Sequence, residues 1–199
     1  MAIDFDARYT EYQANRSWLR RWVRKIYLNS AASQLTGPTL DFGCGIGELL
    51  ERLPAGSRGL EYNFTTVELC RSRGLAVDRY DGFADDWRLT VVPYEVRFDS
   101  MVISHVLEHL ERPTAVLHSL LHTAASRNIG CVLVIVPGKA GYRIDATHRT
   151  FVDHEMLSRP DVVAETGFRL ERLRYFPGNW RRLGEWFPHH ELQALYRRC

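Results

Sequence analysis

The stretch Leu40-Asp41-Phe42-Gly43-Cys44-Gly45-Ile46-Gly47-Glu48-Leu49-Leu50 carries the strongest fold signal in the chain. It predicts a short buried strand, a turn with glycine at alternate positions, and a helix over residues 48–53. Glycine is needed where a backbone takes a positive φ or approaches a ligand closely, because it has no Cβ atom to clash. A helix starting there directs free N–H groups at the turn. The stretch therefore predicts a ligand-binding turn at the carboxyl edge of a parallel sheet.

Length and composition indicate one ordinary globular domain. The 199 residues are 45% hydrophobic and 25% charged, and the net charge of +2 does not by itself indicate nucleic acid or a membrane. The first residues are too polar for a signal peptide, and no apolar run approaches the roughly 20 residues of a membrane span. The cysteines are scattered without a CxxC pair: Cys44, Cys70, Cys131 and Cys199. We therefore expect reduced thiols and a cytoplasmic protein.

Strand and helix patterns alternate along the chain. Residues 39–42, 58–61, 75–80, 98–104 and 130–136 are expected strands, with helices over 65–72 (capped by Asn63) and from Pro113 to Asn128. This alternation predicts βαβ units and a parallel sheet with helices on both faces. Residues 168–176 and 191–198 are expected to form a closing hairpin with 191–198 at the sheet edge. Residues 82–97 and 138–150 are expected loops, the first with one helical turn, and Asp153 is an expected helix N-cap.

The N-terminal region combines a polar arm and an amphipathic helix. The arm, residues 4–15, carries Tyr9 and Tyr12, either of which could close over a bound ligand or lie on the surface. From Ser17 onward, helical spacing places Trp18, Leu19, Trp22, Val23, Ile26 and Tyr27 on one apolar face. The basic residues are expected on the opposite, solvated face: Arg16, Arg20, Arg21, Arg24 and Lys25. Such a helix packs on a sheet or lies on an anionic membrane surface, and we favour packing.

These features together resemble the class I S-adenosylmethionine-dependent methyltransferases of the small-molecule type, from about Tyr9 to the C-terminus. The resemblance is carried by residues 41–47, by Gly59-Leu60-Glu61, by Phe98-Asp99 and by Ser104-His105-Val106-Leu107-Glu108-His109-Leu110. It implies an α/β fold, a Rossmann-like three-layer sandwich around a mostly parallel seven-stranded sheet with an antiparallel last strand. It also implies a single domain over 1–199, with an arm and helix in 1–36 and the core in 37–199.

The glycine spacing distinguishes this turn from that of a dinucleotide-binding dehydrogenase. Such enzymes use G-x-G-x-x-G, whose last glycine admits a pyrophosphate. Here the order is G-x-G-x-G and Glu48 occupies the last position, so its carboxylate would repel a pyrophosphate. Glu61 ends the second strand, where an acid can accept hydrogen bonds from both ribose hydroxyls. The turn is therefore compatible with a ligand that carries an amino-acid moiety and no phosphate. The less favoured interpretation of Glu61 is a solvated surface glutamate.

The resemblance assigns further cofactor contacts position by position. Asp41 would orient the glycine turn and hold the amino end of the methionine moiety. Asp81 would accept from the adenine amino group, with Asp85 or Asp86 as alternatives. Ser104 would line the pocket beside the reactive methyl group. The remaining expected cofactor-binding residues are Gly43, Cys44, Gly45, Gly47 and Tyr62.

Methyl transfer to a hydroxyl or an ammonium group requires a general base that takes the acceptor's proton. Histidine suits this role near neutral pH. His105 follows the fourth strand and His148 lies in the loop after the fifth, so these two are the expected catalytic residues. Alternatively His105 is structural, and His148 pairs with Asp145 or Asp153.

We expect no bound metal, but the sequence offers two metal-dependent alternatives. His105, Glu108 and His109 match the H-x-x-E-H pattern of zinc peptidases, which needs both histidines on one helix face. A second set could hold a divalent cation for catechol-like acceptors: Asp145, His148, Asp153 and His154. A protein that binds the cofactor without catalysis is a further alternative.

The C-terminal third is rich in arginine and tryptophan. Arg169, Arg172, Arg174, Arg181, Arg182, Arg197 and Arg198, with Trp180 and Trp186, could form a surface for RNA or for an anionic lipid or glycan. The sequence contains no appended RNA-binding module. We therefore expect a small-molecule or carrier-linked acceptor rather than nucleic acid, while the oligomeric state is left open.

Overall fold

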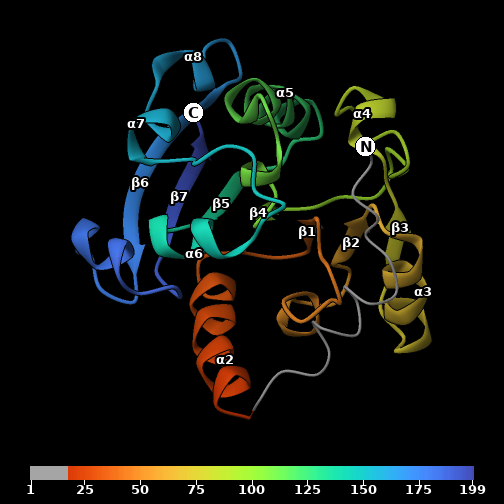
Figure 1. Cartoon of the computed structure of the whole chain (residues 1–199). Coiled ribbons are helices and arrows are strands. Elements are labelled where there is room, and N and C mark those ends of the chain that lie inside the picture. The colour runs from red at the N-terminus through yellow and green to blue at the C-terminus, as the bar shows by residue number, and fades with distance from the viewer. Residues whose placement is uncertain (1–17) are drawn as a thin grey trace.

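The computed structural model describes the backbone of residues 18–199 and the side chains of residues 24–199. Figure 1 shows a central twisted sheet with helices on both faces. The expectations for Tyr9 and Tyr12 lie outside the described residues, as do those for the side chains of Trp18, Leu19, Trp22 and Val23.

The sheet has seven strands in the order β3-β2-β1-β4-β5-β7-β6. Their bounds are β1 Thr39–Phe42, β2 Arg58–Glu61, β3 Val77–Arg79, β4 Ser100–Ser104, β5 Cys131–Pro137, β6 Phe168–Phe176 and β7 Glu191–Arg198. Strand β7 is antiparallel to both of its neighbours, and the strands from β3 to β5 are parallel to one another. The expected fold class is therefore confirmed. The order reverses between β1 and β4, and ligands bind at such a switch point, beyond the carboxyl ends of the strands.

The expected hairpin of β6 and β7 is present, but its placement in the sheet differs from the expectation. Strand β7 lies between β5 and β6, so β6 is the edge strand. The reason is that both faces of β7 are covered. Leu192, Ala194 and Tyr196 pack into the main core on one face, and Leu195 packs beneath α2 on the other. The alternation of Leu192, Ala194 and Tyr196 predicts a strand with one buried face, but Leu195 on the other face of β7 is buried as well.

Helices cover the two faces of the sheet in two separate layers (Figure 1). The longer helices are α2 Trp18–Ala32, α3 Phe64–Ser72 and α5 Pro113–Ser126. Helix α5 packs over the main core, whereas α2 and α3 pack over the opposite face in two smaller clusters. The shorter elements are α4 Gly82–Asp85, α6 Lys139–Ile144, α7 His154–Leu157, α8 Pro160–Val163 and the 3₁₀ turns η1 Leu50–Arg52, η2 Leu107–His109 and η3 Arg181–Glu185.

The local signals at helix starts were accurate. Asn63 caps α3 by accepting from Thr66 N, and Asp153 caps α7 by accepting from Met156 N. Helix α4 is the single turn expected within 82–97. Helix α6 lies where only a loop was expected, because its six residues carry no buried apolar face that would mark a period.

The expected helix over 48–53 is wrong. The segment contains only the 3₁₀ turn η1, because Gly47 takes φ +78° before it and Pro54 ends it after a few residues. Leu49 and Leu50 are buried there, so packing rather than helix propensity decides the local conformation. The glycine turn therefore does not face the N-terminus of an α-helix.

Helix α2 packs against the sheet. Its residues Leu28 and Ala31 join Val102, Leu133 and Leu195 in one buried cluster. Tyr27 is also buried, but Ile26 is 41% exposed, so the expected apolar face is wrong at that position. These contacts support packing over membrane docking. Within the described residues, no helix is both long and apolar enough to cross a membrane.

Candidate functional site

A cavity of about 1300 Å³ opens at the carboxyl ends of the parallel strands. It is lined by the glycine turn after β1, the end of β2, helix α4, the segment after β4 and the 144–149 loop. Its volume exceeds the range of roughly 300–1000 Å³ typical of single small-ligand pockets, so it has room for a cofactor and an acceptor.

The glycine turn is held to β2 by backbone hydrogen bonds. The N–H groups of Gly43 and Cys44 donate to Leu60 O over 2.8 and 3.0 Å. Gly43 has φ +73°, and a Cβ atom there would clash with the side chain of Val106. Gly43, Cys44 and Gly45 line the cavity as expected.

Gly47, in contrast, does not line the cavity. Its φ is +78°, and a Cβ atom at this position would clash with Leu75 and approach Cys70 of α3. The third glycine of the motif thus allows the turn to pack against the region of α3. The sequence pattern could not separate this packing requirement from a ligand contact.

Glu61 is positioned by the backbone at the end of β2. Its two carboxylate oxygens accept from Gly45 N and Asn63 N, each over 2.9 Å. Burial raises the pKa of Glu61, and the N–H groups of Asn63, Gly45 and Tyr62 partly oppose that rise. Each carboxylate oxygen has two acceptor sites, so this fixed group can also accept from ligand hydroxyls.

Asp41 lies behind the turn with only 1% of its surface exposed. Its Oδ2 atom has no hydrogen-bond partner within the described part of the chain. Burial, with a contribution from the nearby Glu61, raises the pKa of Asp41 to about 7, while Arg24 acts in the opposite direction. A buried carboxylate oxygen that lines a cavity and lacks a partner is suited to bind a cationic group.

The acids expected near adenine are not equivalent. Asp81 lines the cavity and caps α4, where its Oδ1 accepts from Phe83 N at 3.0 Å and Ala84 N at 3.3 Å. Asp86 also lines the cavity. Asp85 does not line the cavity and accepts hydrogen bonds from Tyr80 and Thr90, so the structure favours Asp81 and Asp86 over this alternative. Tyr62 lines the same part of the cavity and is 53% exposed.

Ser104 and His105 line the cavity at the end of β4, as expected. His105 is held from both sides: Nδ1 lies 3.1 Å from Glu108 Oε1, and Nε2 lies 3.1 Å from Glu191 Oε1. Burial lowers the pKa of His105, but hydrogen bonds and charge from Glu108 and Glu191 outweigh it and raise the pKa to about 10. Both ring nitrogens are engaged, which leaves no position on His105 for a substrate proton.

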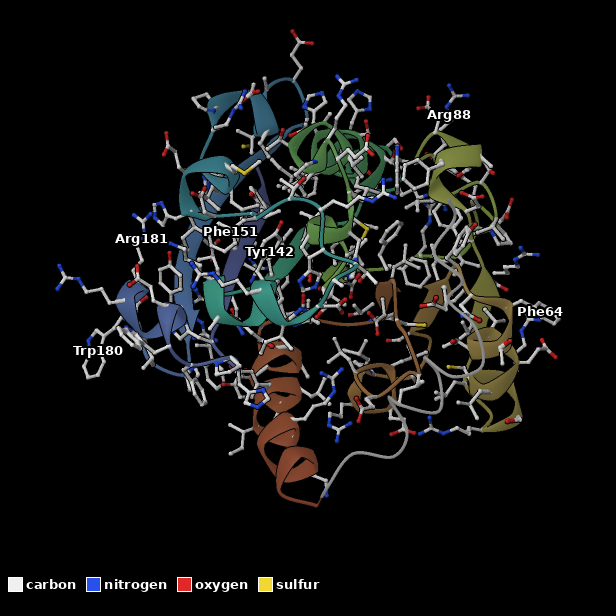
Figure 2. All side chains as sticks on the ribbon, viewed as in Figure 1. Phe64, Arg88, Tyr142, Phe151, Trp180 and Arg181 are labelled. Carbon is white, nitrogen blue, oxygen red and sulfur yellow. The ribbon has the colours of Figure 1, made fainter. Side chains whose placement is uncertain are left out.

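His148 is arranged differently. Its Nδ1 lies 2.8 Å from Tyr142 O, and because a carbonyl only accepts, Nδ1 carries the proton. Its Nε2 lies 3.9 Å from Glu108 Oε1 and 4.0 Å from Asp145 Oδ2. The ring stacks on Tyr142 at 5.4 Å and meets the edge of His109 at 4.8 Å. Figure 2 labels Tyr142 and Phe151, whose rings contact each other beside this site.

Sequence reasoning missed the role of Arg24 at the cavity wall. Arg24 forms an ion pair with Glu48, and both residues line the cavity. Arg24 was grouped with the solvated face of α2, although it lies three and four residues before the buried Tyr27 and Leu28. Helical spacing could therefore have placed it on the inner face.

Neither metal site considered from the sequence is assembled as expected. The peptidase motif needs a helix, but η2 begins only at Leu107 and His105 precedes it with φ +56°. In the second set, Asp153 caps α7 and His154 contacts Ser158, and neither lines the cavity. The structure instead brings together one residue pair of the first set, Glu108 and His109, with His148 of the second.

The C-terminal basic residues are largely engaged within the protein. Arg172 donates to Gln34, and Arg174 donates to Gln193 and Ser30. Arg197 pairs with Glu171, and Arg198 donates to Asn128. Trp180 and Trp186 are 75% and 83% exposed, and Figure 2 shows Trp180 and Arg181 at the outer side of η3. Four of the seven arginines thus have intramolecular partners. All four cysteines are free thiols.

Comparisons with known proteins agree with this fold. A family model described as a methyltransferase domain matches residues 11–196. A SAM-dependent methyltransferase from Archaeoglobus fulgidus has a similar fold, with a TM-score of 0.70 at 20% identity over 97% of this chain and 100% of that one. Magnesium protoporphyrin IX methyltransferase from Synechocystis PCC 6803, with bound SAH, gives a TM-score of 0.63 at 12% identity over 93% and 89%. The small RNA methyltransferase HEN1 gives 0.60 at 18% identity over 88% of this chain and 25% of that chain.

The fold and the site thus define a class I methyltransferase with a Rossmann-like core. The chain belongs to the methyltransferase family whose domain model it matches, and S-adenosylmethionine is the cofactor of this class. None of the curated proteins matches the sequence.

Proposed function

We propose that this enzyme transfers the methyl group of S-adenosylmethionine to an oxygen or nitrogen atom of a small or carrier-linked acceptor. The observation that carries the proposal is the buried Oδ2 atom of Asp41, which has no hydrogen-bond partner among residues 24–199. Asp41 lines the same cavity as Glu61 and His148. The cofactor has a cationic amino group at one end and two ribose hydroxyls near the other. Asp41 and Glu61 offer one carboxylate to each.

The residues present fit this cofactor. Asp41 would hold the amino group, Glu61 the ribose hydroxyls, and Asp81, Asp86 and Tyr62 would surround the adenine end. Arg24 lines the cavity beside Glu48 and carries the positive charge that suits the cofactor's carboxylate. The cofactor supplies an activated methyl group on a sulfonium, so the protein's task is to align the acceptor and exclude water.

We assign the activation of the acceptor to His148 rather than His105. His148 lines the cavity, and because its Nδ1 is fixed on a backbone carbonyl, Nε2 is the ring nitrogen left for the acceptor. His105 uses both nitrogens on Glu108 and Glu191, so its role is to position these carboxylates.

A small or carrier-linked acceptor is favoured because four of the seven arginines expected for a nucleic-acid surface are engaged within the fold. The structural neighbours act on varied molecules, among them a magnesium porphyrin and small RNA, so the fold alone does not select among them. Free thiols are consistent with a cytoplasmic location, which is part of the proposal.

Calorimetry with S-adenosylmethionine and S-adenosylhomocysteine tests the cofactor. Binding of both to the wild type, weakened in Glu61→Gln, is expected. No binding by a folded wild type would refute the proposal. A screen of acceptor mixtures with cofactor labelled in the methyl group then tests catalysis. Methyl transfer to an RNA pool but to no small molecule would show that the acceptor is a nucleic acid. Cofactor binding without methyl transfer to any class of acceptor would indicate a non-catalytic protein.

A further inference from the structure

We propose that Glu108, His109 and His148 form a binding site for a divalent transition-metal ion at the acceptor end of the cavity. One potential ligand atom from each residue lies within 4.8 Å of the others. In the sequence these three residues belong to two different candidate metal motifs, and neither motif assembles as expected.

Glu108 supplies the observation that points to a ligand. Its side chain has no exposed surface, and its Oε2 atom has no hydrogen-bond partner among residues 24–199. The other oxygen, Oε1, is engaged by His105 Nδ1 at 3.1 Å. A buried carboxylate oxygen without a partner is costly, and a bound cation removes that cost.

The two histidines are anchored as metal ligands usually are. His148 donates from Nδ1 to Tyr142 O at 2.8 Å, which leaves Nε2 as the ring atom that faces Glu108. His109 Nδ1 lies 3.3 Å from Thr147 O and 3.0 Å from Thr147 Oγ1. Metal-binding histidines commonly donate their second ring nitrogen to a backbone carbonyl or a carboxylate, which fixes the ring and its tautomer.

The backbone holds the cluster in place. The N–H groups of Arg149 and Thr150 donate to Glu108 O over 2.8 and 3.0 Å, and Thr150 Oγ1 donates to Leu110 O over 2.7 Å. These bonds tie the loop that carries His148 to the turn that carries Glu108 and His109. The three side chains are therefore arranged before any ligand arrives, which lowers the cost of binding one.

The donor set indicates the class of metal. Two imidazoles and one carboxylate suit Zn²⁺, Mn²⁺, Fe²⁺ or Co²⁺ better than Mg²⁺ or Ca²⁺, which prefer oxygen ligands. Three protein ligands leave a coordination position open, as in catalytic rather than structural sites. His109 and His148 line the cavity while Glu108 lies behind them, so the open position is expected on the cavity side.

Such an ion would select acceptors that bring an oxygen to the open position, above all hydroxyl compounds. This consequence rests on the proposed function, whereas the metal site does not. With the ion bound, His148 Nε2 is a ligand rather than a base, so His148 activates the acceptor through the ion. The ion lowers the pKa of a bound hydroxyl, whose proton passes to water. The oxygen then bonds to the methyl carbon, and the carbon–sulfur bond breaks with its electron pair left on sulfur.

The test is direct metal binding to the whole chain. Protein freed of metal with a chelator would be titrated calorimetrically with Zn²⁺ and separately with Mn²⁺, and bound metal would be counted by elemental analysis. We expect one ion per chain, with affinity reduced at least tenfold in Glu108→Gln and in His148→Asn. His154→Asn is the matched control, because His154 is exposed on α7 outside the cavity and should leave binding unchanged.

Cofactor calorimetry on the same proteins separates the two proposals. A variant that loses metal but binds S-adenosylhomocysteine is folded, and that result supports the site. Metal binding by a wild type that does not bind the cofactor would uphold the site while refuting the proposed function. The inference would be overturned if the wild type bound neither Zn²⁺ nor Mn²⁺ at one ion per chain. It would also be overturned if Glu108→Gln, His148→Asn and His154→Asn all bound the metal with equal affinity. If Glu108→Gln fails to fold, the metal affinities of His148→Asn and His154→Asn are compared instead. Weaker binding in His148→Asn alone supports the site, and equal affinities refute it.

Discussion

Replacing Asp41 by asparagine should stabilise the protein at neutral and alkaline pH while it weakens cofactor binding. Asparagine has nearly the same size and shape as aspartate but no charge. Without cofactor, the buried Asp41 has a pKa of about 7 rather than its ordinary value of 3.8. The charged groups near it are Glu61 and Arg24, and the thiols of Cys44 and Cys70 are the other titratable groups beside it.

The magnitude follows from the shift of about three pKa units, each worth about 1.4 kcal/mol. Because the folded state raises the pKa, folding favours the protonated form of Asp41. Its contribution to stability is therefore complete below pH 3.8 and is lost as the pH rises through 7. Above pH 7 the ionised carboxylate should cost about 4 kcal/mol, which Asp41→Asn would remove.

The assay is urea unfolding of wild type and Asp41→Asn, without cofactor, from pH 4 to pH 9. The difference in unfolding free energy should grow from near zero at pH 4 to a few kcal/mol in favour of the variant at pH 8. Glu155→Gln, an exposed carboxylate on α7, is the control and should show no such trend. Parallel curves for wild type and Asp41→Asn across this range would refute the reasoning.

Cofactor binding should change in the opposite direction. Loss of a charged hydrogen bond to the amino group should weaken binding of S-adenosylmethionine by about 1.5–3 kcal/mol. In the wild type, affinity should fall as the pH drops below 7, since Asp41 must be ionised to bind a cation. A carboxylate with only a structural role would not couple greater stability to weaker binding.

Other substitutions test other parts of the site. Glu61→Gln should weaken cofactor binding by about 1.5–3 kcal/mol in calorimetry, because it removes the charge from the acceptor of the ribose hydroxyls. Gly47→Ala should lower the free energy of unfolding in urea by about 1–3 kcal/mol, because residue 47 has a positive φ and the added Cβ atom would clash with Leu75. The cofactor dissociation constant measured on the folded variant should change little. Equal losses of stability and affinity would contradict that division. Leu195→Ala should cost about 2–5 kcal/mol in urea unfolding, since Leu195 is buried beneath α2, and a cost under 1 kcal/mol would show that the cluster under α2 contributes little. His148→Asn should reduce methyl transfer in the labelled-cofactor assay without changing the affinity for S-adenosylhomocysteine.

Local signals in the sequence were sufficient for much of the fold. The alternation of strands with helices predicts the parallel core, and the capping residues Asn63 and Asp153 mark helix starts that the structure confirms. The G-x-G-x-G turn followed by Glu61 at the next strand end predicts the cofactor pocket's components. These inferences succeed because periodicity and turn chemistry depend on near neighbours in the chain.

Features that depend on packing between distant segments could not be predicted. Strand β7 lies inside the sheet because Leu195 is covered by α2, and the helix expected after the glycine turn is replaced by η1. Gly47 serves packing with α3 rather than the cavity, although its spacing is identical to that of a ligand-contacting glycine. In each case the competing contact comes from a residue remote in sequence.

The same distinction divides the candidate site. The sequence alone determined a methyltransferase fold and indicated the carboxylates that we propose for its cofactor, because strand ends and turns place these residues at one sheet edge. Only the tertiary structure decided how the histidines differ. Glu191, from the last strand, engages His105, and the backbone of the 145–150 loop brings His148 to Glu108. Whether a histidine ring nitrogen remains available depends on such partners, which sequence spacing does not encode.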